Sequence, residues 1–198
     1  MIEIKNIPND EPYKLFIKYF EEARKAQQAP INALSISSYD IQKKEVDSRF
    51  VNLKCILQDE WIFFTNYKSP KACAFEKHKQ ISALIYWSSI NIQIRIKAEI
   101  KKTSKTFSDE YFKSRQPEKN ALAISSHQSK KVDKFETIKK NFEYVRKNHD
   151  LTKRPEYWGG FAFTPYYFEF WKGDDFRLNS RDVFELKDDK WLHFKLQP

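Results

Sequence analysis

The sequence predicts a mainly β protein of the α+β class, an antiparallel barrel with flanking helices. Six or more short runs of β-branched and aromatic residues are separated by polar turns, which is typical of strands that pair with their neighbours. Helical patterns are inserted between groups of strands, and closure into a barrel leaves few free strand edges. With 198 residues, 40% of them hydrophobic and including 17 Phe, 10 Tyr and 5 Trp, the chain is expected to form one domain with a large core.

The first half of the chain is expected to begin with a helix and to continue as a meander. Asp10 and Pro12 can start a helix, and apolar residues then recur at helical spacing as far as Pro30, which predicts a helix over 11–28. A short helix is predicted from Ser69 to Lys77. The strands predicted around these helices are 32–38, 49–57, 61–65 and 81–87.

The clearest single element is a strand over 92–100. Ile92, Ile94, Ile96, Ala98 and Ile100 alternate with polar residues, a period of two. One face of this strand is therefore expected to be buried and the other to display polar groups.

The second half is expected to contain helices followed by a β-meander. The predicted helices are 108–115, 117–126 and 133–148, and an apolar stripe on the last consists of Phe135, Ile138, Phe142 and Val145. Beyond Pro155 the predicted strands are 159–163, 166–172, 183–186 and 191–196.

Composition favours some functions and excludes others. The 36 Lys and Arg against 27 Asp and Glu give a net charge of +9, which favours a polyanion, an anionic surface or a phosphorylated small molecule as partner. With only three glycines, no GxGxxG or GxxxxGK[ST] motif can be written, which excludes the dinucleotide-binding and P-loop enzymes that depend on them. Cys55 and Cys73 are isolated and the histidines form no HExxH pattern, so no metal site is predicted. Neither a signal-length apolar run nor a longer apolar stretch occurs, which predicts a soluble, cytoplasmic protein.

Three groups of residues are candidates for chemistry. The first is the polar face around Gln93 together with Arg49, Lys54 and Lys71, on strands expected to be adjacent and on a helix start. A flat aromatic cofactor with a phosphate needs such cations and amides, although solvated surface charges give the same pattern.

The second group is Tyr111 and Arg115, which share a helix face at i and i+4 and are followed by Lys119. They can hold a second phosphate or form a surface pair. The third is a C-terminal strand and loop with Trp171, Arg177 and Arg181, where the tryptophan can equally belong to the core.

The segment FEFWKGDDFRLNSR (168–181) resembles the C-terminal signature of the pyridoxine/pyridoxamine 5′-phosphate oxidases, in which an aromatic-Trp-Gln-Gly stretch precedes Arg-Leu-His-Asp-Arg. Further segments resemble that family's other motifs in the same order: RFVNLK (49–54), FFTNYKSPKA (63–72), IQIRIKAE (92–99), YFKSRQPEKNALAISSHQS (111–129) and PEYWGGF (155–161). The resemblance covers about residues 10–198.

The resemblance implies an FMN-binding split barrel in which two subunits of a homodimer share each flavin site. The positions that correspond to the family's flavin contacts are Arg49, Phe50, Val51, Asn52, Leu53, Lys54, Phe64, Thr65, Lys71, Gln93, Gln128, Ser129, Trp171 and Arg181. The positions that correspond to its substrate contacts are Lys54, Tyr111, Arg115, Lys119, Arg177 and Asn179, the last two being the candidate catalytic residues.

Several positions depart from the family pattern. Pro70 replaces an arginine that helps to bind the flavin phosphate, Lys119 replaces a serine near the substrate phosphate, and Asn179 replaces the histidine of the signature. Asn52, Lys172 and Ser180 differ as well. Lysine can still bind a phosphate, but proline cannot imitate a guanidinium. The flavin site is therefore expected to be mostly retained and the substrate site to be partly altered.

The resulting expectation is an FMN-dependent oxidase of pyridoxal phosphate biosynthesis, which converts pyridoxamine or pyridoxine 5′-phosphate to pyridoxal 5′-phosphate with dioxygen as acceptor. The alternative is a related flavin oxidase or reductase acting on a different small ring compound. A flavin-binding or nucleic-acid-binding module without activity ranks last, because no element interleaves basic and aromatic residues. Residues 1–198 are expected to form one domain, with a helical arm over 1–30 and a dimerisation and substrate meander over 155–198. No membrane or nucleic-acid partner is expected.

Overall fold

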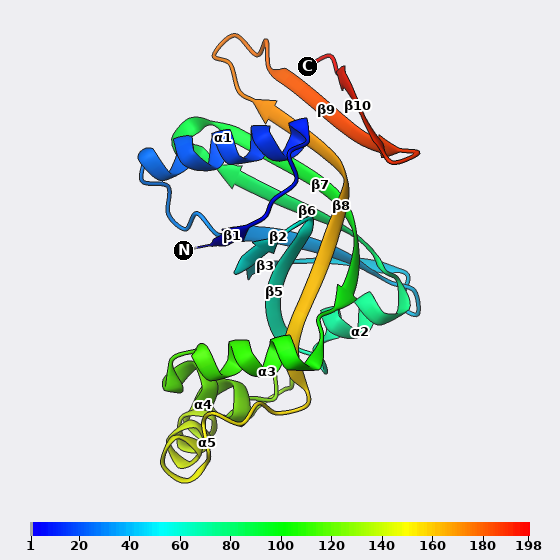
Figure 1. The fold of residues 1–198 in the computed structure, drawn as a ribbon. Coiled ribbons are helices and arrows are strands. Elements are labelled where there is room, and N and C mark those ends of the chain that lie inside the picture. The colour runs from blue at the N-terminus through cyan, green and yellow to red at the C-terminus, as the bar shows by residue number, and fades with distance from the viewer. Residues whose placement is uncertain (1) are drawn as a thin grey trace.

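The computed structural model describes residues 2–198, which contain ten strands and five α-helices (Figure 1). The strands are β1 (Glu3–Lys5), β2 (Ala33–Asp40), β3 (Glu45–Asn52), β4 (Cys55–Leu57), β5 (Glu60–Asn66), β6 (Gln80–Trp87), β7 (Ile92–Lys102), β8 (Trp158–Lys172), β9 (Ser180–Lys187) and β10 (Lys190–Lys195). The helices are α1 (Glu11–Lys25), α2 (Pro70–Lys77), α3 (Lys105–Ser114), α4 (Pro117–Ser125) and α5 (Phe135–Asn148), with a 3-10 turn at Ser88–Ile90. The prediction of a mainly β, α+β chain is confirmed, and most predicted elements are present with ends shifted by a few residues.

The strands form one mixed sheet. Its order is β1-β4-β5-β8-β7-β6-β2-β3, with β9 on β8 and β10 on β9, and this path does not close on itself within the described chain. The prediction of a wholly antiparallel sheet is wrong at one pair, because β1 lies parallel to β4, with Ile4 opposite Ile56. Strand β1 has no signal in the sequence, because three residues are too few to show a period.

The longest strand, β8, was predicted as two. It pairs with β5 near its start and with β9 near its end, and it runs beside β7 for most of its length. Lys97 pairs with Tyr167 and Ala98 with Pro165, so Tyr166 is an extra, bulged residue. Because proline donates no ladder hydrogen bond, a bulge is where a central strand can accommodate it. The strand therefore bends at Pro165 instead of ending there.

The opposite error concerns 49–57, predicted as one strand. The chain forms β3 up to Asn52 and β4 from Cys55, since β3 pairs with β2 whereas β4 pairs with β5. Leu53 is buried in the core at the break, and Lys54 is half-buried beside it. This change of pairing partner brings β3 and β4 to the wall of the cavity described below.

The core lies between α1 and the sheet. The α1 ring of Phe16 packs 4.5 Å from Trp61 on β5 and 5.8 Å from Trp87 on β6, measured between centroids. The helix ends at Lys25, well before Pro30, because Gln27 adopts a left-handed φ of 55°. The Gln28 N–H then donates to the Ala23 carbonyl, a Schellman closure that satisfies the end of the helix.

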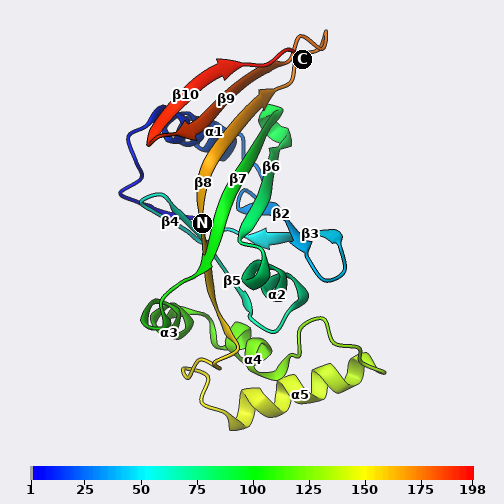
Figure 2. The ribbon, with the colours of Figure 1, turned by 90° about the vertical axis from the view of Figure 1, so that its right-hand side faces the viewer.

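Helices α3, α4 and α5 gather at the other end of the sheet from α1, where α5 packs mainly on α4 (Figures 1 and 2). The predicted apolar stripe of α5 is buried only at Val145, and Phe135 is 62% exposed. A single neighbouring helix covers only part of a helix face, so the other end of the stripe is left in solvent. None of the helices in residues 2–198 is long and apolar enough to span a membrane.

Candidate functional site

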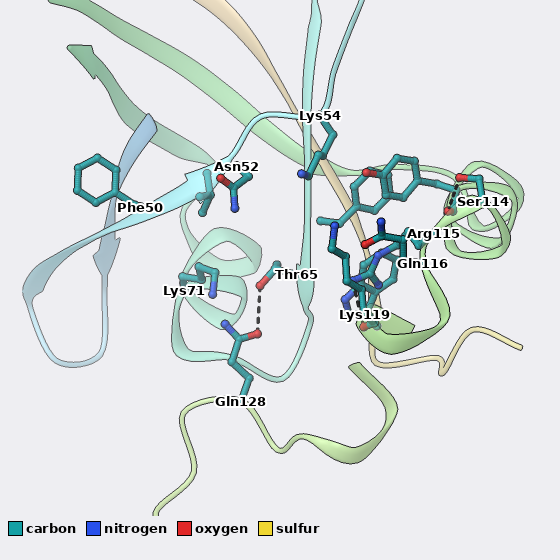
Figure 3. Close-up of a pocket in the computed structure, with 14 residues that line it drawn as sticks. Phe50, Asn52, Lys54, Thr65, Lys71, Ser114, Arg115, Gln116, Lys119 and Gln128 are labelled. Atoms are coloured by element: carbon teal, nitrogen blue, oxygen red, sulfur yellow. Dashed lines mark hydrogen bonds between the residues drawn. The ribbon is translucent and has the colours of Figure 1, made fainter. Parts of the chain in front are cut away.

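A cavity of about 610 Å³ opens where the ends of β3, β4 and β5 meet α2 and the α3–α4 corner (Figure 3). It is lined by Phe50, Val51, Asn52, Lys54, Phe64, Thr65, Lys71, Tyr111, Ser114, Arg115, Gln116, Lys119, Gln128 and Trp158. Four of these residues are cationic and none carries a carboxylate. The cavity is therefore suited to anions.

The cations form two separate groups (Figure 3). Lys71 lies beside Thr65 and Gln128, whereas Lys54, Arg115 and Lys119 lie together at the α3–α4 end. In this second group, burial lowers the pKa of Lys54, and the charges of Lys119 and Arg115 lower it further. Bringing like charges together without a counter-charge is unfavourable, and an anion with several oxygens relieves the repulsion.

Lys71, in the first turn of α2, is only 7% exposed. Its Nζ has one weak contact, 3.4 Å from Ser69 Oγ. Burial, and then the neighbouring charge of Arg49, lower the pKa of this amine to about 8. Gln128 reaches the same region from the loop after α4, and its Oε1 accepts from Thr65 Oγ1 at 3.4 Å and from the Asn66 N–H at 3.3 Å.

Stacked aromatic rings form the wall beside the second cationic group. The Phe64 ring lies 3.7 Å from the Tyr111 ring and 5.2 Å from the Trp158 ring, within 9° of parallel to both. The Arg115 guanidinium sits 4.4 Å above Trp158, where cation–π attraction holds it. Its Nη2 donates to the Lys119 carbonyl at 3.2 Å, but Nη1 is buried without a partner. Burial lowers the pKa of Arg115 and raises that of Tyr111.

Three lining residues were not singled out from the sequence. Ser114 and Gln116 flank Arg115 in the chain, and Trp158 belongs to the PEYWGGF segment. Trp158 could have been noticed through that motif. Nothing in the neighbouring sequence, however, indicated that its ring would lie under the guanidinium of Arg115, some 40 residues earlier in the chain. Pairing of Gly160 with Phe64 brings β8 to this wall.

A second cluster lies at the far end of the sheet. Gln93 on β7 pairs with Trp171 on β8, which pairs with Arg181 on β9. Gln93 and Lys102 stand at opposite ends of β7, about 30 Å apart at roughly 3.3 Å per residue. In the sheet, β6 and β2 lie between β7, which carries Gln93, and β3, which carries Arg49, so the expectation that these residues lie on adjacent strands is wrong within one copy.

Glu169 organises this second cluster. Its carboxylate is 1% exposed and accepts from Arg181 Nε at 2.9 Å and Nη2 at 2.8 Å, from Arg95 Nη1 at 2.7 Å and from Tyr167 Oη at 3.1 Å. Arg177 and Asn179 lie beyond it, in the loop between β8 and β9.

The remaining predicted positions lie close to the cavity without lining it. Arg49 turns toward β2, donating to Ser38 Oγ at 2.8 Å and pairing with Asp47 at 2.5 Å. Leu53 is a core residue, so only its backbone can face a ligand. Ser129 is exposed, with a left-handed φ of 64°.

The chain is similar to known proteins in sequence and in fold. Residues 158–198 match the family model described as the pyridoxine 5′-phosphate oxidase C-terminal dimerisation region. A pyridoxine/pyridoxamine 5′-phosphate oxidase of Leptospira interrogans is 34% identical over 100% of this chain and 92% of its own, and one of Herminiimonas arsenicoxydans is 33% identical over 95% and 90%.

Two solved structures share the fold. PhzG from Burkholderia lata 383, in complex with tetrahydrophenazine-1-carboxylic acid, superposes with a TM-score of 0.90 at 24% identity, over 96% of this chain and 94% of that one. A pyridoxamine 5′-phosphate oxidase-related, FMN-binding protein from Nostoc punctiforme superposes with a TM-score of 0.80 at 13% identity, over 96% and 100%.

Proposed function

Because this chain belongs to the pyridoxine/pyridoxamine 5′-phosphate oxidase family, we propose that it is an FMN-dependent oxidase that converts pyridoxamine or pyridoxine 5′-phosphate to pyridoxal 5′-phosphate with dioxygen as acceptor. The observation that carries the proposal is the pair of cationic groups in one cavity without a carboxylate. Cofactor and substrate each bring one phosphate to such a reaction, and each cationic group can bind one.

The residues of the cavity fit FMN. Lys71 is a buried cation with almost no partner, and Thr65, Gln128 and the backbone of 50–52 stand beside it to hold polar atoms of the cofactor. At the other group, the unpartnered Nη1 of Arg115 is a donor without an acceptor, which a phosphate oxygen satisfies.

When bound, FMN would supply the redox chemistry, as acceptor of a hydride from the exocyclic carbon of the substrate and donor of two electrons to dioxygen, which becomes hydrogen peroxide; with pyridoxamine 5′-phosphate, water would then displace the amine nitrogen as ammonia. The protein binds the two ligands and orients them. Lys54, Arg115 and Lys119 fix the substrate phosphate, and the Tyr111 hydroxyl can donate to it because burial raises its pKa and keeps it protonated. This anchoring turns an encounter between two ligands into a step within one complex.

A homodimeric split barrel completes the proposed site. One copy holds Lys71 and Arg115 at the cavity, while Gln93, Trp171 and Arg181 form a separate cluster on β7, β8 and β9, and none of the three lines the cavity. If both sets bind one flavin, as the family resemblance implies, the second set must come from another copy. The match of residues 158–198 to a dimerisation region supports this arrangement.

The test uses the purified full chain. Its absorbance spectrum, or quenching of flavin fluorescence in a titration, is expected to show FMN binding, and light scattering is expected to give twice the 23.8 kDa chain mass. Peroxide release is expected with pyridoxamine or pyridoxine 5′-phosphate. A monomer that retains flavin would contradict the shared site, and absence of turnover with both phosphates would contradict the proposed reaction.

The affinity for FMN is expected to fall as the pH rises through about 8. The pKa of Lys71 is about 8 without ligand, so its amine is charged below that pH and neutral above it. A phosphate binds the charged form, and between about pH 7 and 9.5 the Kd should rise by up to about 30-fold. In Lys71→Arg the cation persists, so the Kd should change less over the same range. Equal pH profiles for the two proteins, from fluorescence titrations, would show that Lys71 does not bind the phosphate.

A second candidate is a related flavin enzyme acting on a different small ring compound. The observation that favours it is Asn179, whose Oδ1 already accepts from the Asp174 N–H at 3.1 Å, whereas the family motif has histidine there. PhzG shows that this fold can carry a different ring compound, tetrahydrophenazine-1-carboxylic acid.

Substitution of Asn179 by histidine separates the two candidates. Neutral imidazole can accept from the Asp174 N–H through one ring nitrogen and donate toward substrate through the other. If pyridoxamine 5′-phosphate is the substrate, Asn179→His is expected to raise kcat/KM by about 5- to 150-fold, the effect of one contact of roughly 1–3 kcal/mol. Peroxide release measures it. No turnover in either protein would favour the different ring compound.

A further inference from the structure

The loop between β8 and β9 is held in one conformation by its own hydrogen bonds. The Asp174 carboxylate accepts from the Phe176 N–H at 2.9 Å and from the Leu178 N–H at 3.3 Å. The Asp174 carbonyl accepts from the Arg177 N–H at 3.0 Å. Asn179 Oδ1 closes the loop by accepting from the Asp174 N–H at 3.1 Å. Asp174 is thus bonded to every other residue named here.

This network surrounds an unusual backbone conformation. Arg177 has a φ of 63°, in the left-handed region that residues other than glycine seldom adopt unless their surroundings impose it. Within residues 2–198 its side chain makes no hydrogen bond or ion pair. The direction in which the guanidinium leaves the loop is therefore set by the backbone, and the backbone is set by Asp174.

Packing within one copy does not hold this loop. Phe176 is 86% exposed and Leu178 is 75% exposed, so the two residues on either side of Arg177 contribute little to the core. An exposed segment without buried contacts is normally mobile. Here the hydrogen bonds to Asp174 replace the missing packing.

We propose that Asp174, whose backbone N–H is held by Asn179, is a positioning residue that presents Arg177 to the substrate. The inference rests on the proposed function and on the family resemblance, which implies that Arg177 is a substrate contact. Asp174 does not line the cavity. It fixes the backbone from which the guanidinium extends, so that binding substrate does not require ordering the loop.

Three variants isolate the carboxylate as an acceptor. Asp174→Ala removes the charge and both side-chain hydrogen bonds. Asp174→Asn removes the charge but keeps an acceptor oxygen. Asp175→Ala removes the same charge from the neighbouring exposed carboxylate, which accepts no hydrogen bond in the described chain.

Hydrogen exchange in the peptide that covers 174–180 is the first readout and needs neither flavin nor turnover. Asp174→Ala is expected to exchange about tenfold or more faster, whereas Asp174→Asn and Asp175→Ala remain close to the native rate. The second readout is steady-state kinetics of the flavin-loaded protein with pyridoxamine 5′-phosphate. Asp174→Ala is expected to lower kcat/KM about tenfold, mainly through a higher KM, with rescue by Asp174→Asn.

The outcomes separate the inference from the proposed function. If Asp174→Ala and Asp175→Ala exchange alike, Asp174 does not hold the loop and the inference fails. If exchange differs but kcat/KM of Asp174→Ala equals the native value, the loop is held but does not position Arg177, and the inference fails again. If the native protein turns over neither phosphate, the proposed function fails and the positioning of Arg177 for that reaction fails with it, even if the exchange data support the hydrogen bonds.

Discussion

Replacement of Arg115 by alanine is expected to lower kcat/KM for pyridoxamine 5′-phosphate by about 100- to 1000-fold, which corresponds to roughly 3–4 kcal/mol. Arg115 is stacked on Trp158 at 4.4 Å, and its Nη1 is buried without an acceptor inside the chain. Its pre-ordered guanidinium gives two parallel donors to a phosphate at little entropic cost. Loss of that group removes both the charge and the geometry, and peroxide release under substrate titration measures the effect.

The control is Lys113→Ala. Lys113 lies in the last turn of the same helix, is exposed and does not line the cavity, so its loss removes one positive charge without removing a phosphate contact. It is expected to change kcat/KM by less than about threefold, because exposed charges are screened by salt. The kcat/KM of Arg115→Lys should lie between those of the native protein and Arg115→Ala, since an ammonium keeps the charge but not the planar set of donors of a guanidinium. If Arg115→Ala and Lys113→Ala weaken the enzyme equally, Arg115 acts through net charge alone.

Replacement of Glu169 by alanine is expected to destabilise the fold by about 2–4 kcal/mol, because it breaks a buried ion pair from one side. Its carboxylate is the common acceptor for Arg95, Arg181 and Tyr167, at 2.7–3.1 Å. Without it two guanidiniums face each other across β7, β8 and β9 with no counter-charge. The shift of the urea midpoint, with an unchanged slope, gives the loss in unfolding free energy.

Glu185→Ala is the matched control for Glu169. Glu185 lies on β9, is partly exposed and pairs with Lys187 at 3.1 Å. Its removal is expected to cost less than about 1 kcal/mol, as for surface ion pairs. Glu169→Ala should also weaken FMN binding, because Arg181 loses the partner that orients it. A destabilisation equal to that of Glu185→Ala would mean that Glu169 contributes no more than a surface pair.

The sequence by itself determined the features that depend on residues close together in the chain, namely individual strands and family motifs. The two-residue period of 92–100 predicted a strand with one buried face, and β7 buries Ile92, Ile94, Ile96, Ala98 and Ile100. The family resemblance could also be read from the sequence, because the residue types of each motif and the spacing between them are visible without knowledge of the fold. The lack of GxGxxG and GxxxxGK[ST] motifs excluded the dinucleotide-binding and P-loop enzymes that depend on them.

Local pattern also misled at particular residues. Pro165 indicated the end of a strand, but a bulge between two pairing partners accommodates it inside β8. Residues 49–57 have continuous strand character, yet the chain changes its partner from β2 to β5 at Leu53. In both cases the deciding hydrogen bonds are made to strands distant in sequence, which no local window contains.

Only the tertiary structure decided which candidate residues share a site. It joins Lys71 to Lys54, Arg115 and Lys119 in one cavity, and it places Gln93, Trp171 and Arg181 in a separate cluster on β7, β8 and β9 that does not line this cavity. It also places the Arg115 guanidinium over the Trp158 ring, and it forms hydrogen bonds between the Asp174 carboxylate and the loop that contains Arg177. The physical reason is that side-chain chemistry belongs to the residue, whereas its neighbours are set by long-range strand pairing, such as that of Phe64 with Gly160, and by burial of the whole core.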